Sequence, residues 1–90
     1  MARVQVSSMS SGEFDVQVEN VNRVRTHRVV VGQGLLRDLA APPTAGQQIV
    51  SAAFDVLASQ DGLSSLPPLV ELETYRKRRG FVDEIRRRIA

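Results

Sequence analysis

The chain has 90 residues, 42% hydrophobic and 24% charged, which is the composition of one small globular domain. It has no cysteine, which excludes disulfides and fits a reducing compartment. It also lacks a secretory signal and any run near the roughly 18 apolar residues of a membrane helix, so we expect a cytoplasmic protein that makes no membrane contact.

Alternating apolar and polar residues predict a β-hairpin in the first third of the chain. One face of "EFDVQVE" is apolar, while "VRTHRVVV" is rich in β-branched residues, and two asparagines between them suit a turn. We place the strands at residues 13 to 19 and 24 to 31. The apolar face of the first strand, expected to meet the core, consists of Phe14, Val16 and Val18.

The residues before the hairpin fall into two parts. "RVQV", residues 3 to 6, alternates and could add a third strand to the sheet. "SSMSSG", residues 7 to 12, is small, polar and without period, which predicts a mobile connection. Residues 1 to 12 are therefore expected to be either a mobile extension or an edge strand.

Two helices are predicted in the middle of the chain. Leucines in "GLLRDLAAPP" favour a short helix that the two prolines end. "TAGQQIVSAAFDVLASQDG" carries the longest helical pattern, with Ile49, Phe54 and Leu57 on one side. Thr44 and Gln47 have the spacing of a capping box, and Gly62 is placed to end this helix.

The C-terminal third is open to two interpretations. Residues 69 to 79 fit a helix, with glutamates early, cations late and Gly80 as its stop, but their alternation also fits a strand. We favour the helix. Residues 81 to 89 predict a further short helix with one apolar stripe.

Basic residues are concentrated at this end. Residues 71 to 90 hold seven basic and four acidic side chains, an imbalance that points to an anionic partner. Helix chemistry accounts for some of the cations, since Asp83 to Arg87 and Glu84 to Arg88 have favourable i,i+4 spacing. The run 76 to 79 would spread around a helix, so several of its cations would face solvent or a partner. The candidate phosphate or partner contacts are Arg76, Lys77, Arg78, Arg79, Arg86, Arg87 and Arg88.

Two further features have a functional and a structural interpretation. "VVVGQGLL" resembles the glycine-rich start of a dinucleotide site, but Arg37 stands where a third glycine is needed and no βαβ unit follows, so we expect a simple loop. His27, the one histidine, could act as an acid or base, but no oriented partner is evident. We expect it to have a structural role in its strand. No catalytic set, metal site or cofactor site is predicted.

The order of short patterns resembles a group of small, uncharacterised bacterial proteins. In that group an "F-x-V-x-V" strand precedes "T-x-H-x-V-x-V", a helix with Phe, and a closing "F-x-x-E-I". The matching segments here are "FDVQV", "THRVVV", "SAAFDVL" and "GFVDEI". The resemblance implies a bacterial origin and a hairpin followed by helices, and it implies no mechanism.

The sequence thus predicts an α+β fold in which a small antiparallel sheet packs against three or four short helices. A sheet with open edges and a chain too short for a large core favour a homodimer. We expect a non-enzymatic protein-interaction module that associates with itself or another protein through the sheet edge or the C-terminal helix. The alternative is a nucleic-acid-associated protein that uses the basic C-terminal segment, and its binding would weaken steeply with salt.

Overall fold

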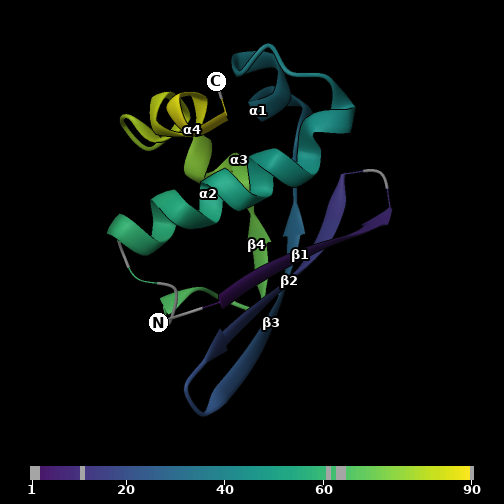
Figure 1. Cartoon of the computed structure of the whole chain (residues 1–90). Coiled ribbons are helices and arrows are strands. Elements are labelled where there is room, and N and C mark those ends of the chain that lie inside the picture. Colours follow the sequence, from purple (N-terminus) through teal and green to yellow (C-terminus); the bar gives the residue numbers. More distant parts are fainter. Residues whose placement is uncertain (1–2, 11, 61, 63–64, 90) are drawn as a thin grey trace.

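The computed structural model describes residues 3–10, 12–60, 62 and 65–89. The fold is α+β, as predicted, with helices gathered on one side of a twisted sheet (Figure 1). In chain order its elements are β1 (Arg3–Ser10), β2 (Glu13–Asn20), β3 (Arg23–Val30), α1 (Gln33–Asp38), the 3-10 turn η1 (Pro43–Ala45), α2 (Gly46–Gln60), β4 (Leu69–Glu71), α3 (Leu72–Arg76) and α4 (Phe81–Ile89).

The sheet has four strands in the order β1-β2-β3-β4. The hairpin is confirmed: β2 and β3 pair antiparallel from Glu13 opposite Val30 to Asn20 opposite Arg23. β1 adds to β2 in the same antiparallel sense, whereas β4 pairs parallel to β3. The sheet is therefore mixed and not wholly antiparallel, because the chain between β3 and β4 crosses back over the sheet as helices.

The prediction of one helix over residues 69 to 79 is wrong. Residues 69 to 71 form the parallel strand β4, in which Val70 lies opposite Val29 and is fully buried. Only Leu72–Arg76 is helical, and Leu72 also lies in the core. Two prolines just before this segment favour an extended backbone, and pairing with β3 continues it. The alternating pattern was thus the correct guide for the first three residues.

The N-terminal strand is longer than predicted. β1 runs through Ser10, so residues 7 to 10 belong to the sheet and are not a mobile connection, while Ser11 lies outside the described residues. The register shifts between Ser8 and Ser10, which is a β-bulge close to the turn into β2. Of the two alternatives for this segment, the strand is the one that the structure contains.

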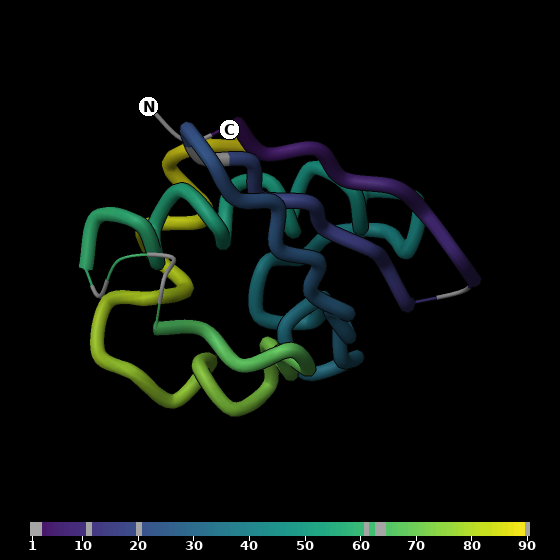
Figure 2. The backbone as a smooth tube through the Cα atoms, turned by 90° about the horizontal axis from the view of Figure 1, so that it is seen from below, coloured from purple at the N-terminus to yellow at the C-terminus, as the bar shows by residue number. Residues whose placement is uncertain are grey.

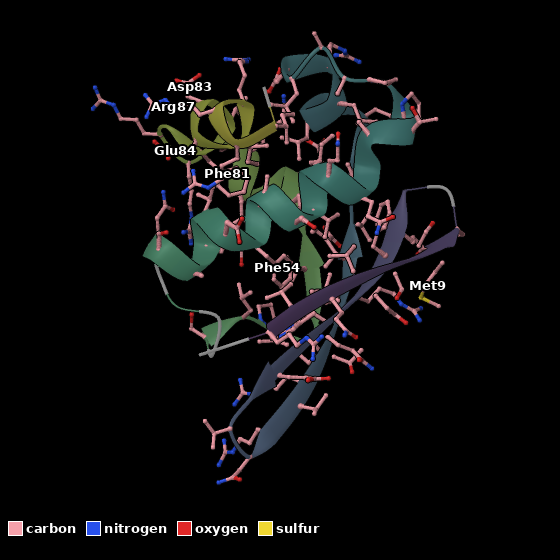
Figure 3. The ribbon with its side chains drawn as sticks, viewed as in Figure 1. Met9, Phe54, Phe81, Asp83, Glu84 and Arg87 are labelled. Atoms are coloured by element: carbon pink, nitrogen blue, oxygen red, sulfur yellow. The ribbon has the colours of Figure 1, made fainter. Side chains whose placement is uncertain are left out.

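Helix α2 lies across the sheet and supplies much of the core. Ile49, Phe54 and Leu57 are buried, as predicted, and Figure 3 places Phe54 between α2 and the sheet. A methyl group on Gly46 would lie 2.6 Å from Cζ of Phe14, so glycine lets the start of α2 approach β2 closely. At the other end the Gly62 N–H donates to the Leu57 carbonyl and Gly62 has φ +79°, which confirms the predicted glycine cap.

The capping box predicted for this helix does not form. Thr44 lies within η1, and α2 begins two residues later at Gly46. Gln47 instead directs its side-chain amide to the Val6 carbonyl in β1, at 3.3 Å. The 3-10 turn ahead of the helix displaces the capping positions, and Gln47 becomes a contact between α2 and the sheet.

Helix α4 closes the fold over α2. Phe81 and Ile85 are fully buried on its inner side, and Gly80, with φ +81°, makes the turn that separates α4 from α3. Figure 2 shows from a second direction that α4 lies alongside α2. Among the residues that the structure describes, no helix has the length and apolar character to cross a membrane.

Candidate interaction surface

The seven C-terminal basic residues do not form one continuous helical face. Arg76 is the last residue of α3, and the next three cations lie in the turn before α4. The expectation that positions 76 to 79 spread around a helix is therefore wrong. Each cation has to be placed by its own contacts.

Arg76 is used inside the fold. Its Nη1 lies 3.0 Å from Oδ2 of Asp38, and its Nε lies 3.0 Å from Oε2 of Glu73, although the Nε–H is not aligned for a hydrogen bond. The hydrogen bond to Asp38 and the negative charges of Glu73 and Asp38 raise the pKa of Arg76. The Arg76 guanidinium, shared between two carboxylates, connects α3 to the end of α1. Its charge and N–H donors are therefore largely used within the protein and not open to an outside phosphate.

Glu73 explains the two glycines that resemble a dinucleotide site. Its Oε1 accepts the Leu35 N–H at 2.9 Å, at the start of α1. A methyl group on Gly32 would lie 2.1 Å from Cγ of Glu73, and one on Gly34 would lie 2.8 Å from Oε2. The glycines therefore make room for a carboxylate of the protein itself, which binds the amide that a phosphate would otherwise bind.

The arginines of α4 also have internal partners. Arg88 pairs with Glu84 at 2.9 Å, as the i,i+4 spacing predicted. Arg87 pairs with Glu84 as well, and Asp83 pairs with Arg86, so the predicted Asp83–Arg87 pair is wrong (Figure 3). Arg86 additionally donates to the Asp38 carbonyl at 2.6 Å. The i,i+3 partner is the one within reach in both of these cases.

The two ion pairs of Glu84 have a defined pH dependence. The hydrogen bond from Arg88, followed by the charge of Arg87, holds the pKa of Glu84 below its ordinary value of 4.5. A carboxyl whose pKa is lower in the folded state stabilises that state above its ordinary pKa. The contribution is therefore complete at neutral pH and is lost as the pH falls through the lowered pKa.

Three exposed cations remain in the turn between α3 and α4. Arg78 stacks over the Tyr75 ring, with Cζ 4.7 Å from the ring centroid. Lys77 and Arg79 are exposed, and the described part of the chain offers neither of them an acidic partner. The basic surface open to a partner is thus smaller than the sequence suggested, and it is a turn rather than a helix.

A pair of substitutions separates the structural cation from the exposed ones. Arg76→Gln should lower the melting temperature by several degrees, because Asp38 and Glu73 lose their shared partner. Arg79→Gln should leave it unchanged, because the part of the chain that the structure describes gives this side chain no ion pair. Thermal denaturation followed by circular dichroism measures both, and an equal effect of the two would contradict the assignment of Arg76.

His27 has a structural position. It is 2% exposed, and its Nδ1 lies 2.7 Å from the Pro67 carbonyl, which sets the tautomer with the proton on Nδ1. The ring lies 6.0 Å from that of Phe54, and Nε2 is buried without a hydrogen-bond partner. His27 therefore ties β3 to the segment that leads into β4. In the described ranges no group of three potential ligands is arranged for a metal ion.

The longer of the two edge strands of the sheet is β1. This strand is eight residues long and forms one edge, and no described strand lies on its outer side. The opposite edge is β4, which has only three residues. A long edge strand presents unpaired N–H and C=O groups, whereas a short one presents few.

Two hydrogen bonds establish which backbone groups of the sheet face which neighbour. The Val31 N–H donates to the Gly12 carbonyl on the β2 side at 2.8 Å, and the Arg28 N–H donates to the Pro68 carbonyl on the β4 side at 2.7 Å. In an antiparallel ladder, residues alternate between facing one neighbour and facing the other. Odd-numbered residues of β3 therefore face β2, and even-numbered ones face β4.

The same alternation continues across the sheet to its edge. Asp15 lies opposite Arg28, which faces away from β2, so the backbone groups of Asp15 face β1, where its partner is Ser7. Ser7, Gln5 and Arg3 are thus the residues that bond β2. The residues of β1 whose N–H and C=O groups point out of the sheet are Val4, Val6 and Ser8.

The side chains of β1 do little to block this edge. The strand has no lysine and no proline, and its one charge is Arg3 at the start. Val4 and Val6 are half-buried against the core, and the bulge lies beyond Ser8. The contact of Gln47 with the Val6 carbonyl is the one hydrogen bond from a side chain that meets these outward groups in the described structure.

Sequence reasoning located this edge incompletely. The alternation of residues 3 to 6 indicated a strand, but the length of β1 and the role of Gln47 were missed. The spacing of Thr44 and Gln47 pointed to a capping box, and no local signal reveals a contact between residues 41 positions apart.

Comparison with protein-family models, curated proteins and solved structures finds no match for this chain. The resemblance to small bacterial proteins stays a prediction. The function has to follow from the geometry of the chain itself.

Proposed function

We propose that this protein is a non-enzymatic interaction module that forms a homodimer by pairing the edge of β1 with β1 of a second copy. The observation that carries the proposal is the outward row of backbone groups on Val4, Val6 and Ser8. They belong to a long edge strand that has none of the usual protective lysines or prolines. Strand addition would satisfy these groups by main-chain hydrogen bonds.

A second copy suits this edge because the strand is complementary to itself. In an antiparallel pair around a two-fold axis at Val6, Val6 meets Val6 and Val4 meets Ser8, so outward groups meet outward groups. The half-buried Val4 and Val6 would then extend the core across the interface. The interface would be completed by Gln5 opposite Ser7 on the other face.

The charges of the strand are compatible with this register. Arg3 meets Met9 of the other copy, so the two Arg3 side chains lie at opposite ends of the paired strands. Six positions at about 3.3 Å each separate them by about 20 Å, well beyond the screening length of about 8 Å at physiological salt. Met9, which is 51% exposed, would gain an aliphatic neighbour in the stem of Arg3.

A cytoplasmic location belongs to the same proposal. None of the 90 residues is a cysteine, which fits a reducing compartment. The Nδ1 of His27 bonds the backbone carbonyl of Pro67 and not a carboxylate that could orient a catalytic base, which supports a structural role.

Sedimentation velocity over about a hundredfold range of protein concentration tests the proposal. We expect a reversible monomer–dimer equilibrium in the micromolar to millimolar range, because one strand buries little area, and only a small effect of salt. A monomer at every concentration would contradict it.

A titration of labelled duplex DNA and structured RNA tests the alternative. We expect no complex at physiological salt, because four of the seven C-terminal cations are paired within the fold. Salt-sensitive binding that disappears when Lys77, Arg78 and Arg79 are changed to glutamine would instead establish a nucleic-acid surface. Arg76 is left intact in that variant so that folding is not disturbed.

A further inference from the structure

Gln47 occupies a special position beside the open edge. It lies in the first turn of α2, and its Nε2 donates to the Val6 carbonyl at 3.3 Å. The close approach of Gly46 to Phe14 holds this end of α2 over the sheet, so the amide of Gln47 reaches β1. Its neighbour Gln48 is also exposed, but the described structure gives its side chain no such bond.

The carbonyl that Gln47 occupies is the one that pairing requires. Val6 points its N–H and C=O out of the sheet, and in the two-fold register each Val6 carbonyl would accept the N–H of Val6 in the other copy. A distance of 3.3 Å is long for an N–H···O bond, whose usual value is about 2.9–3.0 Å. The bond is therefore weak enough to be exchanged for a strand.

We infer that Gln47 is a competitive gate on the edge of β1, which holds the Val6 carbonyl in the monomer and releases it when the second copy pairs. The inference rests on the proposed function and adds a residue that regulates it. Each dimer has two such gates, so the equilibrium constant for dimerisation contains the release of both.

The test compares Gln47→Ala with Gln48→Ala. Both changes remove a glutamine amide from the same turn of α2 and have the same effect on helix propensity, but only the first frees the Val6 carbonyl. Sedimentation measures the dimer dissociation constant of each variant and of the wild type. We expect Gln47→Ala to dimerise on the order of tenfold more tightly than Gln48→Ala, because its dimer forms without breaking the two hydrogen bonds from Gln47 to Val6.

A second readout follows the amide itself. In a spectrum of ¹⁵N-labelled protein, the side-chain NH₂ signal of Gln47 should shift as the dimer forms, and that of Gln48 should not. Equal dissociation constants for the two variants, in a protein that still dimerises, would overturn the gate and leave the edge proposal standing. If the wild type and both variants, including Gln47→Ala, are monomers at every concentration, the gate and the edge pairing would both be overturned. A wild-type monomer whose Gln47→Ala variant dimerises would support the gate but contradict the proposed homodimer of the wild-type protein.

Discussion

Replacing Ser7 by proline should strongly destabilise the protein, whereas replacing Ser8 by proline should leave it folded and prevent self-association. The two serines are adjacent, exposed and in the same strand, so the substitutions are chemically matched. They differ in the direction of their backbone N–H and C=O groups. Those of Ser7 face β2, where Ser7 lies opposite Asp15, whereas those of Ser8 point out of the sheet. Proline removes the N–H in each case.

The loss at Ser7 breaks the ladder between β1 and β2. A backbone carbonyl left without its donor costs about 1–3 kcal/mol, and the proline ring also pushes against the neighbouring strand. A domain of this size has a total stability of only about 5–15 kcal/mol, so the effect is large. At Ser8 the missing donor faced solvent in the monomer, a position at which sheets tolerate proline.

Urea denaturation and sedimentation of the same samples give the two readouts. We expect the urea concentration at the unfolding midpoint to fall sharply for Ser7→Pro and to stay near the wild-type value for Ser8→Pro. In sedimentation, Ser8→Pro should be a folded protein that no longer forms the dimer. The opposite order of stabilities would show that the outward residues of β1 had been assigned to the wrong side.

Gly32→Ala should destabilise the wild-type protein and stabilise a variant that already carries Glu73→Ala. Gly32 has φ −84° and ψ 162°, which alanine adopts without strain, so the backbone is not the obstacle. The obstacle is the Glu73 side chain, which would lie 2.1 Å from the added methyl group. To avoid it, Glu73 must leave the Leu35 N–H that it caps.

The effect of Gly32→Ala on the free energy of unfolding should have opposite signs with and without Glu73. In the presence of Glu73 we expect a cost of about 1–3 kcal/mol, as for other overpacked sites. Without Glu73 the methyl group meets no carboxylate, and Gly→Ala then stabilises by about 0.4–1 kcal/mol through the unfolded chain.

A double-mutant cycle from chemical denaturation measures the coupling between the two positions. Gln33→Ala, between the glycines, is the control and should have little effect in either background. Additive free energies for Gly32 and Glu73 would mean that the glycines serve some purpose other than room for Glu73.

Local patterns were sufficient for the parts of the fold that repeat regularly. The alternation around Phe14 predicted β2, and the spacing of Ile49, Phe54 and Leu57 predicted the buried side of α2. Gly62 ends α2 as expected, because glycine adopts a positive φ at little cost. Gly80 does not end the predicted helix, since α3 already stops at Arg76, and it turns the chain into α4 instead.

Contacts between distant parts of the chain were not predictable in the same way. Val70 lies in a strand because Val29 is beside it, and no feature within residues 69 to 79 determines that pairing. The glycines at positions 32 and 34 were expected to form a simple loop, and nothing in the sequence identifies Glu73 as the side chain for which they make room. The ion pairs of Arg76 depend on the packing of α3 against α1, which also follows only from the complete fold.

The edge of β1 illustrates both cases. Its strand character was visible in residues 3 to 6, yet the direction of its backbone groups depends on hydrogen bonds made by β3 with residues far along the chain. The open edge and its contact with Gln47 therefore emerge only when the sheet is complete.

Amide hydrogen exchange in ¹⁵N-labelled protein, recorded at low and at high concentration, tests the edge pairing most directly. The N–H groups of Gln5 and Ser7 should be protected at both concentrations, because they bond β2. Those of Val4, Val6 and Ser8 should exchange quickly in dilute protein and become protected as the dimer forms. If these three amides stay unprotected at a concentration where sedimentation finds a dimer, the two copies associate through another surface and the pairing of β1 is wrong.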